Sequence, residues 1–219
     1  MIVRVNQLNT KNFGVSPTMP EVPFQGTRSR LRVQVEPLSQ RYYGKVFNDL
    51  HAETVGYHLV PHQPYHSYIE ADGFRLELDR AGRPVYVSVS QWSKGADVRP
   101  LSPPTDFDLA DLRFLDLRIH CGRPVIEYDP DNALLRIVFR DSSDCHHVAL
   151  EPHAIWSIDT DRNLCALWLR DIVLDPSGRR FLKWRRRAWS RVRRDFKAGR
   201  LAYPQFPTPL SAPEKTSRS

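Results

Sequence analysis

The sequence predicts a mainly β protein that ends in one basic amphipathic helix. Short segments of alternating apolar residues, separated by turn formers, recur through residues 29 to 175. Eleven basic residues lie at helical spacing between Arg179 and Arg200, and eighteen prolines outnumber ten glycines. A period of two is typical of strands with one buried face, and frequent prolines favour short elements joined by turns. We therefore expect two tandem antiparallel β modules that form a pseudo-dimer, a C-terminal helix and two extended terminal arms.

Composition shifts along the chain indicate where these parts begin and end. The expected order is an N-terminal arm (1–28), a first β module (29–92), a linker (93–124), a second β module (125–175), the basic helix (176–200) and a proline-rich tail (201–219). Within the linker, Thr105 and Asp108 suit a short helix over residues 106 to 118, although LRFLDLRI is equally compatible with a strand. Modules this small bury little surface alone, so pairing would complete a core.

The second module is the more regular of the two. In YDPDNALLRIVF, residues 129 to 132 favour a turn, and Leu135, Ile137 and Phe139 alternate on one face of a strand. Two further strands, VALEP and AIWSI, precede the turn DTDRN. The closing segment CALWLRDIVL is apolar on both faces, which predicts a strand buried in the sheet.

The first module repeats part of this plan. FRLELDRAGRPVYVSVSQW aligns without gaps to IWSIDTDRNLCALWLRDIV when position 79 is set against 159. DRAG favours a hairpin turn in which Gly82 supplies a positive φ. Upstream, LRVQV and YYGKVF are expected to open this copy, and the histidine-rich stretch HAETVGYHLVPHQPYHSY is expected to connect them to the hairpin.

The second module resembles the DUF2283 family of small bacterial β proteins of uncharacterised function. YDPDNALLRI and IDTDRNLCALWL fall in register with the family pattern, over about 50 residues. The sequence departs from that pattern at Ala133, where Asp is usual, at Arg162, where a turn Gly is usual, and at Ser88 and Trp168, where a late Glu is usual. The resemblance implies a small antiparallel fold and, for some members, an antitoxin-like binding role, with no catalytic residue or cofactor.

The segment after residue 175 is predicted to be a helix with two different faces. Asp175 and Pro176 suit the N-cap and first position, and Gly199 suits the end. One face carries a predicted docking stripe at spacings of three and four: Phe181, Trp184, Ala188, Trp189, Val192 and Phe196, with Leu182 beside it and Arg185 intruding. The opposite basic face consists of Arg180, Lys183, Arg186, Arg187, Arg191, Arg193, Arg194 and Lys197.

The positive charge of the chain belongs to this helix. Residues 1 to 178 contain nineteen Lys and Arg against 23 Asp and Glu, whereas residues 179 to 200 contain eleven against one. Such a localised patch indicates an anionic partner, and nine arginines to two lysines favour the fork geometry that binds phosphate and carboxylate.

We therefore expect a non-enzymatic binding or accessory protein that the helix and arms anchor to nucleic acid or to a nucleic-acid-containing complex. The alternative is a structural subunit of a larger assembly, whose arms and basic helix bind acidic protein surfaces. A membrane is the less expected partner, because the apolar stripe is predicted to be buried against the sheet.

Other candidate sites have simpler interpretations. Pro61 and Pro64 interrupt the spacing of four between His58, His62 and His66, so these histidines, with His146 and His147, are expected in loops rather than around a metal. Five aspartates could pair for catalysis: Asp129, Asp131, Asp159, Asp161 and Asp171. Three of them lie beside a proline or in hairpin turns, where Asp is favoured for its local hydrogen bonds, so turn chemistry is the simpler interpretation. No nucleotide-binding or hydrolase motif is present, so we expect no catalytic residues and no cofactor.

The three cysteines and the N-terminus indicate the expected compartment. Cys121, Cys145 and Cys165 have no metal-binding or redox spacing, so free thiols are expected. The N-terminal residues contain no long apolar run of the kind that a signal peptide needs, and no run reaches the length of a membrane span. The sequence therefore predicts a cytoplasmic protein.

Overall fold

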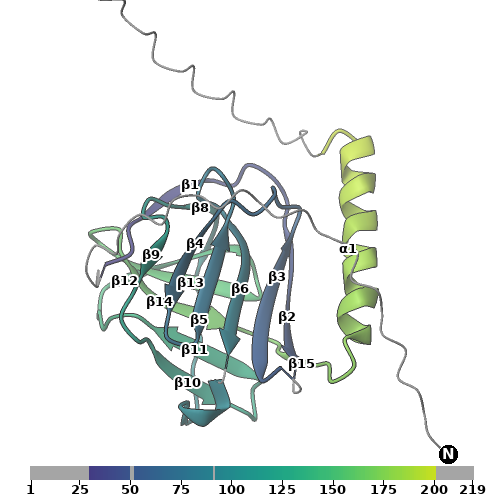
Figure 1. The fold of residues 1–219 in the computed structure, drawn as a ribbon. Helices are drawn as coiled ribbons and strands as arrows, with labels where there is room; N and C mark the ends of the chain where they lie inside the picture. Colours follow the sequence, from purple (N-terminus) through teal and green to yellow (C-terminus); the bar gives the residue numbers. More distant parts are fainter. Residues whose placement is uncertain (1–29, 50–51, 91, 201–219) are drawn as a thin grey trace, which may run out of the picture.

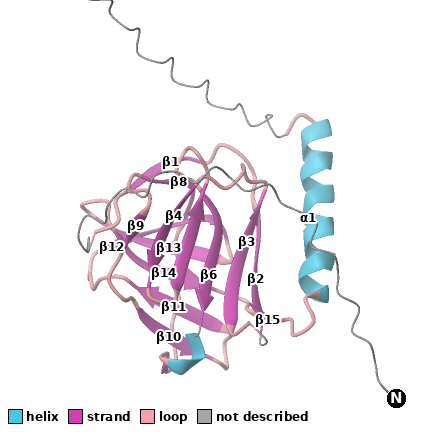
Figure 2. Cartoon of the chain, viewed as in Figure 1, coloured by secondary structure: helices cyan, strands magenta, loops and turns pink. Residues whose placement is uncertain are grey.

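Two packed β-sheets form the body of the protein, and one α-helix lies against the outside of one sheet (Figure 1). This computed structural model describes residues 30–49, 52–90 and 92–200. Strands make up most of the body in Figure 2. The prediction of a mainly β protein with a C-terminal helix is confirmed, whereas both predicted terminal arms lie outside the described residues.

The sheets have seven and eight strands. The seven-stranded sheet has the order β15 (Val173–Leu174), β2 (Tyr43–Asp49), β3 (Thr54–Val60), β6 (Pro84–Ser90), β5 (Phe74–Leu78), β4 (Ser67–Ala71) and β9 (Ile119–His120). The eight-stranded sheet has the order β1 (Val33–Pro37), β8 (Asp108–Phe114), β12 (Cys145–Glu151), β13 (Ala154–Asp159), β14 (Leu164–Leu169), β11 (Leu134–Val138), β10 (Val125–Asp129) and β7 (Asp97–Val98). A 3₁₀ turn (Trp92–Lys94) and helix α1 (Arg179–Lys197) complete the elements.

The core lies between the two sheets and draws on both. Alternate residues of β3 and β6, such as Tyr57 and Val87, are fully buried against β13 and β14 residues such as Trp156 and Leu167. Every residue of β14 is buried, as its two apolar faces predicted. Its second face is covered by a smaller cluster that includes Leu101, from the segment before β8. The eight-stranded sheet is therefore covered on both sides, which explains its continuous apolar strands.

The two sheets contain five strands connected in the same order. Strands β2, β3, β6, β5 and β4 occupy the places that β10, β11, β14, β13 and β12 occupy in the other sheet. Both sets are antiparallel, and each continues at its first strand into a short parallel partner: β15 beside β2, and β7 beside β10. This shared strand order is consistent with two tandem β modules. The prediction that they form a pseudo-dimer stays a prediction.

The aligned hairpins have matching turns. Asp79 accepts hydrogen bonds from the backbone of Ala81 and Arg83, and Asp159 accepts one from the backbone of Asn163. Gly82 and Arg162 occupy equivalent places with φ of 82° and 63°. Arg162 therefore adopts, without a glycine, the left-handed conformation for which the resembled family uses one.

Three predicted elements need correction. Residues 106 to 118 are not a helix: strand β8 runs from Asp108 to Phe114, pairing with β1 and β12. The alternative strand interpretation of LRFLDLRI holds only for its first three residues, which end β8, and its last residue, which begins β9. LRVQV does not open the first module, because β1 pairs with β8 in the other sheet. The histidine-rich connection contains strand β3, whose Val55, Tyr57 and Leu59 alternate into the core.

Candidate functional site

Helix α1 is attached to the seven-stranded sheet at its first turn. Strand β15 pairs in parallel with β2, and Gly178 then adopts a left-handed φ of 66° before the helix begins at Arg179. The predicted start at residue 176 is therefore wrong, because that φ is incompatible with a helix. Asp175 nevertheless caps the helix, since its carboxylate accepts the backbone N–H groups of Arg180 and Phe181 at 3.2 and 2.7 Å.

The end of α1 follows the prediction closely. The helix ends at Lys197, and Gly199 has a φ of 67°. The backbone N–H of Ala198 and of Gly199 donate to the carbonyl oxygens of Arg194 and Phe196. A left-handed glycine that closes the last carbonyl groups is a common helix terminator.

The predicted docking stripe lies against the sheet, with one exception. Ala188 and Val192 are buried against Val60 of β3, and Trp184 and Trp189 are partly buried beside them. Phe181 meets the ring of Phe47 edge-on at 5.5 Å. Phe196, by contrast, is 43% exposed, so the stripe ends one turn before the helix does.

A buried carboxylate holds the second half of the helix. Asp195, the single acid of the basic segment, accepts a hydrogen bond from the Tyr43 hydroxyl at 2.5 Å and pairs with Arg200 at 3.2 Å. Burial, and then Asp195, raise the pKa of Tyr43. Sequence reasoning missed this anchor, although its spacing of three and seven residues from Val192 and Ala188 places it on the docking face.

One histidine is built into the interface under the helix. His58 of β3 lies between the rings of Phe181, at 4.3 Å, and Tyr86, at 4.6 Å. Burial, together with the nearby charge of Arg185, lowers the pKa of His58 to about 4. The prediction of a loop position is wrong for His58, which belongs to strand β3, and also for His146 and His147, which belong to strand β12, because both strands begin in segments that were interpreted as connections.

The basic face is presented to solvent along the whole helix. All eight predicted residues are exposed. Arg180 donates to the carbonyl oxygen of Leu174, and Arg191 lies over the ring of Tyr43 at 5.7 Å. Within the described part of the chain, no carboxylate lies within ion-pair distance of any of the eight. The face is thus a concentration of positive charge that the described body does not neutralise.

The other candidate side chains, the aspartates and cysteines, have structural roles. Asp129 and Asp159 cap turns. Hydrogen bonds from the Asn132 side chain and the Leu101 N–H lower the pKa of Asp129. Burial raises the pKa of Asp159, but the hydrogen bonds from Asn163 and the charge of Arg140 together lower it. Among the described residues, no group of three His, Cys, Asp or Glu side chains is placed to hold a metal. The three cysteines are free thiols. No helix in the described ranges has the length and apolarity to cross a membrane.

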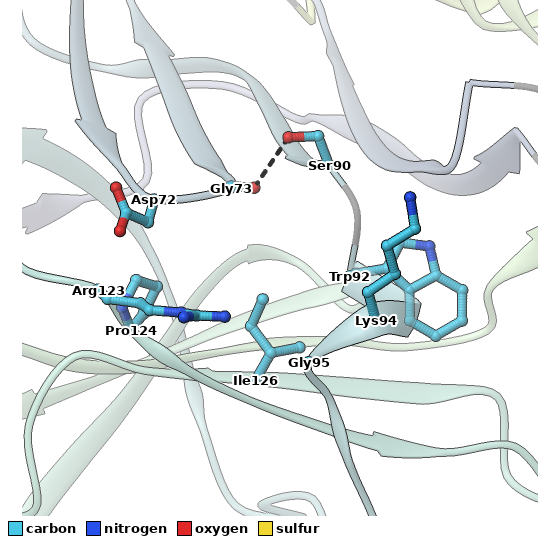
Figure 3. A pocket seen from close by; sticks show the side chains of 9 residues that line it. All are labelled: Asp72, Gly73, Ser90, Trp92, Lys94, Gly95, Arg123, Pro124 and Ile126. Atoms are coloured by element: carbon cyan, nitrogen blue, oxygen red, sulfur yellow. Dashed lines mark hydrogen bonds between the residues drawn. The ribbon is translucent and has the colours of Figure 1, made fainter.

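Two further polar features lie away from α1. At the edge of β2, His153 links Lys45 (Nε2 to Nζ, 3.2 Å) to the buried Glu151 (Nδ1 to Oε2, 2.6 Å) and so joins the two sheets. A hollow of about 180 Å³ lies beside the β4–β5 turn (Figure 3). Its wall carries charges of both signs, Arg123 and Lys94 beside Asp72, and Lys94 is paired with Glu53 at 2.9 Å. Neither feature has the single-signed charge of α1.

Comparison with known proteins adds no relative from which roles could be transferred. No family model and no curated protein sequence matches this chain. The resemblance to the DUF2283 family therefore stays a prediction, and the candidate site depends on the geometry of α1.

Proposed function

We propose that this protein is a non-enzymatic binding protein that uses the exposed face of α1 to attach to the phosphate backbone of nucleic acid. The observation that carries the proposal is a helix docked on the sheet, with eight exposed bases that have no carboxylate partner in the described body. Mutual repulsion along such a face is relieved when phosphates replace water and counterions around it.

The composition of the face supports phosphate over a generic acidic surface. Six of its eight residues are arginines, whose planar guanidinium binds two phosphate oxygens at once. The docking contacts also order the helix before any partner arrives. Because Asp195 and the aromatic stripe fix the helix on β2 and β3, binding requires little further ordering of the backbone.

The test is a salt titration of binding to nonspecific DNA and RNA, followed by fluorescence anisotropy. The expected result is affinity that falls steeply with salt and is lost when Arg186, Arg187, Arg193 and Arg194 are changed to Glu. The matched control changes Arg30, Arg41, Arg80 and Arg123 to Glu. These four arginines are also exposed but lie outside α1, so the control alters net charge equally and should retain more affinity. Absence of binding to either polymer at low salt would overturn the proposal.

The alternative function is a structural subunit whose basic helix pairs with acidic protein surfaces in a larger assembly. A pull-down from native lysate, with and without nuclease, separates the two functions. Partners that disappear after nuclease treatment support the nucleic-acid function. Partners that persist, and that the charge-reversed helix fails to capture, favour the assembly subunit.

A further inference from the structure

Resting on the proposed function, we infer that α1 binds double-helical nucleic acid across a groove, through two rows of cations that each follow one phosphate strand, without reading the base sequence. The helix lies along the outer side of the β2–β3 part of the sheet, and none of the other described elements covers its opposite side (Figure 1). The arrangement of its cations around the axis carries the inference.

Seven of the eight cations of the basic face fall into two rows, and the eighth, Lys183, lies close to the line between them. Successive helical residues turn by about 100°, so the direction opposite the buried Ala188 and Val192 runs close to Ser190 and Lys183. On one side of this outward line lie Arg180, Arg187, Arg191 and Arg194, and on the other lie Arg186, Arg193 and Lys197. The rows are roughly 110° apart around the axis and flank the outward line.

A double helix presents matching charges. Its groove is bounded by two lines of phosphates, whereas a single strand offers one. The 19 residues of α1 span about 28 Å, over which duplex DNA carries one negative charge per roughly 1.7 Å of axis. A helix with cations on both sides of its outward line can contact both phosphate strands at once. The phosphates of a single strand can contact only one row of cations unless the strand crosses the outward line.

The presented face lacks the groups that favour single strands or specific bases. Proteins that bind single strands use aromatic rings as stacking platforms, but Phe181 and Trp184 contact Phe47 of β2, and Trp189 contacts His62. The exposed Phe196 lies about 120° around the axis from the outward line and so outside the presented face. The helix contains no Asn or Gln to read adenine, and the hydroxyl of Ser190 already donates to the Arg186 carbonyl. Charge is therefore the main property that the face can recognise.

The experiment compares a duplex with its separated strand, at equal phosphate concentration and near 0.1 M salt, by fluorescence anisotropy. We expect the duplex to bind at least about tenfold more tightly, because each additional phosphate contact steepens the salt dependence by nearly one unit. Duplexes of different base composition should bind within about threefold of one another. DNA and RNA duplexes are parallel arms of the same measurement.

Row-specific variants test the geometry. Neutralising one row with Arg186→Gln, Arg193→Gln and Lys197→Gln, or the other with Arg180→Gln, Arg187→Gln and Arg194→Gln, should remove most of the preference for duplex while weakening single-strand binding less. The control triple is Arg30→Gln, Arg80→Gln and Arg123→Gln, on exposed positions of the body.

The outcomes distinguish the groove geometry from the proposed function. Equal or tighter binding of the single strand would overturn the groove geometry and leave the proposed function standing. A strong preference for G·C-rich duplexes would overturn sequence independence, since arginine reads guanine well. Retention of full duplex preference in both row variants would refute the two-row assignment. Absence of binding to every polymer would instead refute the proposed function itself.

Discussion

The partly buried His58 should make docking of α1 depend on pH, and the structure gives the size of the effect. The pKa of this histidine is about 4 in the folded protein and 6.5 when exposed. Between these values only the unfolded chain binds the proton, so stability is complete above pH 6.5 and is lost as the pH falls towards 4. The lowering of the pKa from 6.5 to about 4 corresponds to about 3 kcal/mol of stability at neutral pH.

The perturbation that isolates this effect is His58→Phe. Phenylalanine keeps the ring between Phe181 and Tyr86 and cannot be protonated. Chemical unfolding, followed by the fluorescence of Trp184 and the other tryptophans, should show a free energy of unfolding that falls with acidification in the wild type and falls less in the variant. His66→Phe, at an exposed position, is the control. Equal pH slopes for wild type and His58→Phe between pH 6.5 and 4 would refute the reasoning.

Three further predictions concern backbone and packing. Gly44→Ala places a Cβ in overlap with the Glu151 carboxylate and 2.7 Å from the ring of Tyr57, so it should lower the free energy of unfolding by about 2 to 3 kcal/mol in denaturant titrations, and an unchanged midpoint would contradict this. Arg162→Gly should raise that free energy by about 0.5 to 1 kcal/mol, since the residue has a φ of 63°; a destabilised variant would show that the side chain matters more. Asp175→Ala removes the cap of α1 and should lower stability by about 1 kcal/mol with a loss of helical circular dichroism, whereas unaltered helicity would argue against capping.

The sequence predicted the elements whose apolar periodicity is not interrupted by polar residues or prolines. Strands β13 and β14 were identified from their apolar residues and the turn at Asp159, and α1 from its spacing of three and four. Strand β3 was missed although Val55, Tyr57 and Leu59 alternate, because its histidine and the prolines that follow resemble a connection. The two-residue strands β7 and β15 are too short to carry a periodic signal, and their pairing is decided by tertiary packing.

For the candidate site, the sequence predicted the two faces of the helix but not its contacts with the sheet. Helical periodicity separates the basic face from the docking stripe, and the exposure of all eight bases agrees with it. The exposure of Phe196 could not be read from spacing, because it depends on where the sheet beneath the helix ends. The roles of Asp195 and His58 required knowledge of β2 and β3 as neighbours of the helix, which no local pattern supplies.

The exchange of short parallel strands between the sheets has a consequence for assembly. Strand β7 follows the strands of the seven-stranded sheet in sequence but pairs with β10, and β15 follows the strands of the other sheet but pairs with β2. If the connection between the sheets opens, the same pairings can be completed by a second molecule without any new contact. Domain-swapped dimers that place two α1 helices on one particle are therefore the expected by-product of refolding at high concentration.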